Sequence, residues 1–334
     1  MKNNLKWFFC FGRIVAAWAM VCICSFANAA GDWFHFQEAI MGTEINVELF
    51  EPNNNAARAK EISDQVMQMM RHIDNTMSPW IEASDVAQAN RWGGEKPVKI
   101  GEETFGVIKR SFYYSDISHG AFDISFASIG YKYDYRKHLQ PTESEITAAL
   151  PLINYKAIIL DEKEHTIKFA HPGMRIDLGG IAKGYSVDRG VEILKRNGIE
   201  HGMVNAGGDS FVLGDRFGRP WYVGIKNPRG EGTVIKLPIS NLAISTSGDY
   251  ERYFEQGGKR VHHIINPKTG RSATGIISVS VLADKSETAD GLTKPVFIMG
   301  VEEGLKLING LPNVSAIIID AQGKVHYSND LVGM

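Results

Sequence analysis

Apolar residues along the chain recur at helical spacing in some segments, and the spacing predicts where helices lie. Residues 56–71 carry apolar side chains three and four positions apart, which predicts an amphipathic helix. Residues 185–197 repeat this spacing, and Gly198 follows as a helix stop. The polar residues 133–147 predict a loop that leads into a further helix near Thr142.

Alternating apolar and polar residues, with glycines at the ends of the runs, predict strands elsewhere. The predicted strands are residues 44–50, 202–207, 221–225, 242–248, 261–265, 277–283 and 315–320. Their order does not follow a strict strand–helix repeat, so we expect an α+β fold. No internal repeat or low-complexity linker divides the chain. A chain of about 300 residues buries a large core as one domain or as two interlocked subdomains.

The N-terminal residues predict export. Three basic residues precede an apolar run at 14–24, and small residues follow at 27–29. This order is typical of a cleaved signal peptide, here residues 1–29, in front of one domain at 30–334. The apolar run is shorter than the about 20 residues that span a bilayer. We therefore expect a periplasmic protein without a stable membrane anchor.

Composition excludes several classes of site and partner. The three cysteines, Cys10, Cys22 and Cys24, all lie in the predicted signal peptide, so the mature chain has no disulfide and no thiolate metal site. The 36 basic and 38 acidic residues give a net charge of −2. Without a basic surplus, we expect no nucleic-acid partner.

A glycine-rich segment, "RIDLGGIAKGYSVDRG" at residues 175–190, is a candidate phosphate site. The pattern predicts a strand that ends at Asp177, a turn at Gly179 and Gly180, and a helix that opens near Lys183. Free N–H groups and a cation at a helix start suit a phosphate. A glycine turn without any ligand explains the same residues.

The segment "ETADGLTKPVFIMG" at residues 287–300 is a candidate cation site. We expect Asp290 and Thr293 near the start of an apolar helix, with Pro295 in its first turn. Ordinary helix capping accounts for these residue types. A hard cation such as Mg²⁺ also accepts such a carboxylate.

Two shorter segments complete the candidates. The run "VHHIINPKTG" at residues 261–270 places His262 and His263 at the end of a strand, where a histidine is often only structural. Neutral imidazole is also suited to take a proton near neutral pH. The glycine pair Gly207 and Gly208 predicts a tight hairpin.

Taken in order, segments of this chain resemble the ApbE-type FAD:protein FMN transferases. The matching runs are "MGT", "MSPWIEASDVAQAN", "GAFDIS", "IDLGGIAKGYSVDRG", "VNAGGD", "ISTSGDYERYF", "HHIINPKTG" and "ADGL" followed by "VFIMG". They span residues 41–300. The resemblance implies an ApbE-like α+β fold, T-fold-like, with mixed sheets, interleaved subdomains and a flavin cleft between them.

The resemblance also implies an activity. An exported enzyme of this kind binds FAD and Mg²⁺, cleaves the pyrophosphate, attaches FMN through a phosphoester to a Ser or Thr of an acceptor flavoprotein, and releases AMP. Two alternatives stay open. One is a metal-dependent FAD pyrophosphatase that transfers FMN to water, and the other is a non-catalytic periplasmic flavin-binding protein.

The resemblance assigns a role to each site residue. His263 is the implied catalytic residue. The implied FAD contacts are Met41, Trp80 (usually tyrosine in relatives), Ala121, Phe122, Asp123, Asp177, Lys183 and Ile264. The implied magnesium ligands are Gly180 through its carbonyl, Asp290 and Thr293.

One departure from the family pattern concerns the cation. Relatives commonly carry Thr four residues after the metal-binding Asp, whereas this chain has Lys294 there and Thr293 one residue earlier. An ammonium beside a divalent cation is unfavourable. We expect magnesium to be retained through Asp290 and Thr293, and the alternative is that Lys294 pairs with the pyrophosphate in place of the metal.

Overall fold

The computed structural model describes residues 31–332 of the 334-residue chain. The predicted signal peptide lies outside the described residues. Within the described part, no helix combines the length and the apolar character that crossing a membrane requires.

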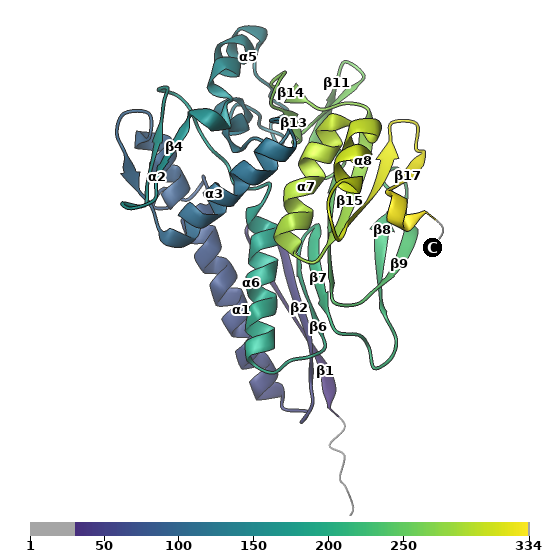
Figure 1. Cartoon of the computed structure of the whole chain (residues 1–334). Helices are drawn as coiled ribbons and strands as arrows, with labels where there is room; N and C mark the ends of the chain where they lie inside the picture. Colours follow the sequence, from purple (N-terminus) through teal and green to yellow (C-terminus); the bar gives the residue numbers. More distant parts are fainter. Residues whose placement is uncertain (1–30, 333–334) are drawn as a thin grey trace, which may run out of the picture.

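An eight-stranded sheet forms the centre of the molecule (Figure 1). In spatial order its strands are β1 (Asp32–Ile40), β2 (Thr43–Glu51), β6 (Gly202–Ala206), β7 (Asp209–Leu213), β10 (Leu242–Gly248), β15 (Ile276–Ala283), β16 (Val314–Asp320) and β17 (Val325–Tyr327). Every pair of neighbouring strands in this sheet is antiparallel, so the sheet is not mixed in strand direction. The α+β class predicted from the sequence is confirmed.

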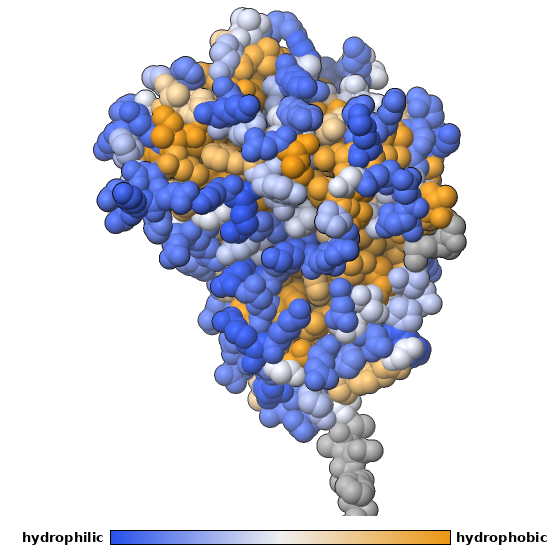
Figure 2. All heavy atoms as spheres, in the orientation of Figure 1, coloured by the Kyte–Doolittle hydropathy of each residue, from blue (hydrophilic) through white to orange (hydrophobic). Residues whose placement is uncertain are grey.

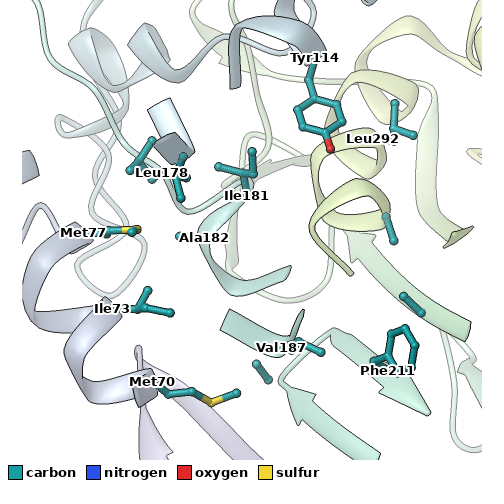
Figure 3. Packing of buried hydrophobic residues seen from close by; sticks show 14 of the residues in the cluster. Met70, Ile73, Met77, Tyr114, Leu178, Ile181, Ala182, Val187, Phe211 and Leu292 are labelled. Atoms are coloured by element: carbon teal, nitrogen blue, oxygen red, sulfur yellow. The ribbon is translucent and has the colours of Figure 1, made fainter. Parts of the chain in front are cut away.

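Four helices cover one face of this sheet. They are α1 (Ala56–Met77), α6 (Ala182–Arg196), α7 (Ser286–Met299) and α8 (Val301–Asn309). Their inward residues, among them Met70 and Ile73 of α1 and Leu292 of α7, are fully buried (Figure 3). The lower part of this face, where α1 and α6 lie, is mostly hydrophilic on the outside (Figure 2). The helices predicted at residues 56–71 and 185–197 are therefore confirmed.

A second layer is inserted between α1 and α6, above the upper end of the main sheet in Figure 1. Its elements are α2 (Asp85–Trp92), β3 (Val98–Lys99), α3 (Glu102–Ile117), η1 (Ile124–Phe126), α4 (Ala127–Gly130), α5 (Glu143–Ala149), η2 (Leu150–Leu152), η3 (Tyr155–Ala157), β4 (Ile158–Asp161) and β5 (Thr166–Phe169). Thr142 caps α5 with a capping box, as predicted. One apolar cluster joins Ile45 of the sheet to Ile167 of β5, so the two layers share a core.

Three hairpins complete the fold. They are β8 (Trp221–Lys226) with β9 (Thr233–Ile239), β11 (Tyr253–Gln256) with β12 (Lys259–His262), and β13 (Ile265–Asn266) with β14 (Arg271–Ser272), and a short helix η4 (Asn329–Leu331) lies near the C-terminus. Trp221 of the first hairpin packs on Val212 of β7 in an apolar cluster separate from the main core. The strand predicted at 261–265 is interrupted, because β12 ends at His262 and β13 starts at Ile265.

Two predictions about local structure are wrong, and each has a cause distant in sequence. Helix α7 begins at Ser286, so Asp290, Thr293 and Pro295 lie inside it and not in its first turn. Asp188 of α6 accepts hydrogen bonds from the N–H groups of Ser286 and Glu287 and thereby starts the helix earlier. The capping role expected for Asp290 and Thr293 is therefore excluded.

The strand expected to end at Asp177 is likewise absent, because residues 174–178 belong to no helix or strand. The side chain of Asn90 in α2 bonds both backbone groups of Ile176 instead. Leu178 and Ile181 are fully buried in the main core, as Figure 3 shows. They anchor the turn at Gly179 and Gly180 immediately before α6.

Candidate active site

Three segments meet at the upper end of the main sheet. A Cβ on Gly207 would lie 2.5 Å from the Thr43 hydroxyl of the β1–β2 connection, and one on Gly208 would lie 2.6 Å from the Thr246 carbonyl of β10. Gly207 has φ +64°, which favours glycine. The predicted hairpin at this glycine pair is confirmed. Because Gly207 and Gly208 have no side chains, the neighbouring strand ends can approach closely.

Two carboxylates and two lysines form a charged cluster at this end of the sheet. Lys183, in the first turn of α6, pairs with the buried Asp209 of β7, which also accepts a hydrogen bond from the Ser245 hydroxyl. Burial opposes the charge on Lys183, but Asp209 and Asp290 raise its pKa. Burial also opposes ionisation of Asp209, but Lys183 and Lys294 hold its pKa below the usual value. The carboxylate and ammonium groups therefore keep each other charged.

The second ion pair of the cluster lies where α6 crosses α7. Asp290 is fully buried, and one of its carboxylate oxygens accepts the N–H of Gly184 at 3.0 Å. Its other oxygen pairs with the ammonium of Lys294. A Cβ on Gly184 would lie 2.3 Å from the Ser286 carbonyl oxygen. Glycine at this position therefore lets the two helices touch and brings Asp290 to the N-terminal turn of α6.

Two of the three predicted magnesium ligands, Asp290 and Thr293, have hydrogen-bond partners within the chain. Both Asp290 carboxylate oxygens already have donors, one of them a cation. The Thr293 hydroxyl donates to the Asp290 backbone carbonyl at 2.9 Å and accepts from Ser247 at 2.9 Å. No three His, Cys, Asp or Glu side chains within residues 31–332 are grouped to hold a metal ion. The expectation that magnesium is retained here is not supported by this geometry.

The adjacent histidines have different surroundings. His262 is buried, its Nε2 lies 2.8 Å from the Ala273 carbonyl, and its Nδ1 accepts the N–H of Ile264 at 3.3 Å. Each contact fits one neutral tautomer, with the proton on Nε2. The N–H of Ala273 in turn bonds the Ile264 carbonyl at 2.9 Å. Both backbone groups of Ile264 are thus engaged, and only the second lone pair of its carbonyl is left for a ligand.

His263 lies in the break between β12 and β13 and is half-buried. Its backbone N–H donates to the backbone carbonyl of Arg252 at 3.1 Å. Its Nδ1 is buried and, within the described chain, has no hydrogen-bond partner. Burial, followed by the positive charge of Arg252, lowers the pKa of His263 to about 3. Lys183 and Lys294 act in the same direction. The imidazole is therefore neutral at physiological pH, and three positively charged side chains contribute to this.

The two carboxylates predicted to bind FAD differ in how many of their oxygens already accept hydrogen bonds from the chain. Asp123 is buried and accepts hydrogen bonds from Ser125 and from the Tyr155 N–H, so both of its oxygens serve the chain itself. Asp177 bonds the Gly179 N–H through one oxygen only. Burial raises the pKa of Asp177, and Arg252 partly offsets this. Asp177 retains an oxygen that can accept a bond from a ligand.

The predicted apolar contacts lie around the same turn. Phe122 is buried, and a Cβ on Gly180 would lie 3.2 Å from its ring and 4.0 Å from the Lys294 stem. Ala121 is buried next to Phe122. Trp80, by contrast, is 79% exposed in the connection after α1. An indole this exposed contributes little to the core and is free to stack on a planar ring.

Met41 lies in the β1–β2 turn with φ +56°, and its N–H bonds Asp74 at 3.2 Å. A surface hollow of about 670 Å³ adjoins it. Glu38, Glu44 and Asp74 line this hollow. Such an acidic lining repels a pyrophosphate, so we place the candidate site on the side of Lys183 and His263.

Sequence reasoning missed three residues that position this site. His262 holds the backbone after His263, Asp188 sets the start of α7, and the charge of Arg252 lowers the pKa of both His263 and Asp177. The "HH" pair carried a signal for the first. No local pattern identified the other two, because their partners are distant in sequence.

Comparison with known proteins identifies the family of this chain. The ApbE family model matches residues 41–318. Curated FAD:protein FMN transferases are similar over most of their length. The transferase of Treponema pallidum is 29% identical, and the match covers 88% of this chain and 86% of the relative. The transferase of Vibrio cholerae is 28% identical, and the match covers 94% of this chain and 96% of the relative.

Solved structures are similar as well. The ApbE protein of Thermotoga maritima superposes with a TM-score of 0.81 at 32% identity, covering 90% of this chain and 98% of its own. The flavin transferase ApbE of Vibrio cholerae superposes with a TM-score of 0.81 at 26% identity, covering 90% of this chain and 98% of its own. The family model matches most of the chain, and the fold matches over nearly all of the described residues. This chain therefore belongs to the ApbE family.

Proposed function

We propose that this chain is an FAD:protein FMN transferase that moves FMN from FAD to a Ser or Thr hydroxyl of an acceptor flavoprotein. The observation that carries the proposal is the imidazole of His263, whose buried Nδ1 has no hydrogen-bond partner in the described chain and whose pKa is lowered by burial and by nearby cations that include Lys183 and Lys294. Membership of the ApbE family supports the same activity.

In the proposed complex the pyrophosphate of FAD lies at the start of α6. Ile181, before helix α6, provides no side-chain cap, and the Asp290 carboxylate of α7 accepts the Gly184 N–H in the first turn. A helix N-terminus favours an anion. Lys183 adds a positive charge there. Asp177 accepts a hydrogen bond from the flavin part through its free oxygen, and the exposed ring of Trp80 stacks on the isoalloxazine. Phe122 and Ala121 bound the space behind the glycine turn.

In the proposed reaction the acceptor hydroxyl oxygen attacks the phosphorus on the FMN side of the pyrophosphate. His263 takes the hydroxyl proton as general base. The bond from that phosphorus to the bridging oxygen breaks, and AMP leaves with the electron pair. Bound phosphate charge offsets the cations around His263 and raises the pKa of His263 toward its ordinary range, which makes it a better base than in the free protein. No step uses a divalent cation.

We also propose that the reaction occurs in the periplasm. The charged, apolar and small-residue zones of residues 1–29 support export with cleavage after Ala29. Intact-mass measurement of the exported protein tests this. A chain that retains residues 1–29 contradicts it.

A direct assay tests the transferase proposal. The mature protein is incubated with FAD and a periplasmic extract, and proteins are separated on a denaturing gel. We expect a fluorescent flavin band that survives denaturation and is absent when His263→Ala protein is used. Quantitative conversion of FAD to free FMN and AMP without such a band favours the pyrophosphatase, and FAD binding without cleavage favours the non-catalytic flavin-binding protein.

A further inference from the structure

The position of Lys294 points to a change in how this chain holds the pyrophosphate. Lys294 lies one helical turn after Asp290 in α7 and pairs with its carboxylate. The Asp290 side chain is fully buried, whereas 19% of the Lys294 side chain is exposed. The lysine therefore lies between the buried carboxylate and the open side of the site.

The stem of Lys294 flanks the place where an anion is expected. Its Cδ lies 4.0 Å from the Cβ position of Gly180, in the turn that leads into α6. Lys183 lies in the first turn of the same helix and is already paired with Asp209. Lys294 thus adds a second ammonium beside the first turn of α6, where the Ile181 side chain provides no cap but the Asp290 carboxylate already accepts the Gly184 N–H.

The same ammonium excludes a divalent cation from Asp290. A metal ion at that carboxylate would share each oxygen with a donor already present, Lys294 on one and the Gly184 N–H on the other. Bringing a double charge next to an ammonium adds like-charge repulsion that is strong where both are partly desolvated. A lysine is by itself a recognised phosphate ligand that acts as a point charge.

We propose that Lys294 takes the place of a divalent cation at the pyrophosphate, so that this chain binds and cleaves FAD without a metal ion. The inference rests on the proposed function. Lys294 neutralises charge on the phosphate that leaves with AMP, and Asp290 holds the ammonium in position.

Binding titrations test the proposal separately from catalysis. FAD, ADP and riboflavin are titrated into the mature protein in excess EDTA and in Mg²⁺. We expect equal FAD and ADP affinities in the two media. Lys294→Thr frees Asp290 and places a hydroxyl beside it, so FAD and ADP should bind about 10- to 100-fold more weakly in EDTA, the scale of one lost charged hydrogen bond. Mg²⁺ should restore this loss, and riboflavin, which has no phosphate, should be unaffected.

Two further variants control for folding and for charge. Lys306→Thr removes a lysine from an exposed helical ion pair in α8 and should change none of the affinities. Lys294→Arg keeps the charge and should bind FAD in EDTA. If Lys294→Thr does not fold, FAD titrations of the parent and of Lys294→Arg in EDTA and in Mg²⁺ still show whether binding needs a metal ion.

The outcomes distinguish this inference from the proposed function. If EDTA abolishes FAD binding by the parent protein and Mg²⁺ restores it, the proposed role of Lys294 is wrong. Flavin transfer in Mg²⁺ would then still support the transferase. Metal-independent, Lys294-dependent FAD binding without any transfer supports the inference and contradicts the transferase. Failure of FAD to bind in either medium contradicts both.

Discussion

At the scale of single residues, two neighbouring histidines have different surroundings, and we propose a separate role for each. His262 uses both ring nitrogens to hold Ala273 and Ile264 in place. His263 has a buried nitrogen without a partner in the described chain, which is a costly arrangement unless a ligand uses the side chain. We assign proton transfer to His263 and positioning to His262.

Replacement of His263 by alanine should therefore leave FAD binding intact and slow flavin transfer by about 10²- to 10⁴-fold, the scale of a lost general base. Fluorescence titration gives the affinity, and the rate of flavin attachment gives the transfer. His35→Ala, which removes an exposed histidine of β1, is the matched control. Transfer at the parental rate in His263→Ala would return His263 to a structural role.

The protonation of His263 should respond to the ligand. In the free protein, burial and the nearby cations lower its pKa to about 3. A bound pyrophosphate offsets those cations, so the pKa should rise when FAD or ADP binds. Binding then takes up protons, and affinity should increase as pH falls toward the pKa of the complex. Histidine NMR with and without ADP, with His263→Ala to assign the signal, measures the shift, and an unchanged or lower pKa contradicts the placement of the phosphate.

The sequence carried much of the information at this scale but not all of it. Histidine and lysine chemistry indicated His263 and Lys183, and the structure places both at the same end of the sheet. The state of Asp290 was not predictable, because its two hydrogen-bond donors come from Gly184 and Lys294, and only packing of two helices brings Gly184 to it. The same limit applies to Asp123, whose partners include the Tyr155 N–H.

At the scale of elements, the site depends on the crossing of α6 and α7. Gly184 allows the contact, and Asp188 one turn later fixes where α7 begins. Local periodicity predicted that both helices exist, because apolar spacing is a local signal. It misplaced the start of α7, since the capping carboxylate comes from a residue 98 positions earlier. The segment at Ile176 was misread as a strand for the same reason.

The crossing gives a test. Gly184→Ala places a methyl group 2.3 Å from the Ser286 carbonyl oxygen, so the helices must separate. We expect a loss of about 1–3 kcal/mol in the free energy of unfolding, which is typical of overpacking, together with weaker FAD binding. Chemical denaturation and FAD titration measure the two effects.

The matched control for the crossing is Gly106→Ala in α3. The new methyl group there would approach only the flexible end of Arg110, at 3.2 Å. Its helix should be stabilised by up to about 1 kcal/mol because alanine favours helix over glycine. Equal stability changes in the two variants would show that the α6–α7 contact is not tight.

At the scale of the whole molecule, the main sheet gathers chain segments that are far apart in sequence at one end, beneath the inserted layer (Figure 1). Glycines at the β6–β7 hairpin and before α6 let these segments approach one another closely. Periodicity predicted the α+β class and five of the eight strands of the main sheet, namely β2, β6, β10, β15 and β16, but not β1, β7 or β17. It did not predict the strand order, because pairing of β2 with β6 spans the inserted layer.

The central claim is that the chain transfers FMN to a protein hydroxyl and does not merely hydrolyse FAD. The most direct measurement is mass spectrometry of a purified acceptor domain after incubation with the mature enzyme and FAD, with AMP quantified in the same reaction. The account predicts one FMN phosphoester on a Ser or Thr of the acceptor for each AMP released, and neither product with His263→Ala. AMP accompanied by an equal amount of free FMN, with the acceptor unmodified, would contradict it.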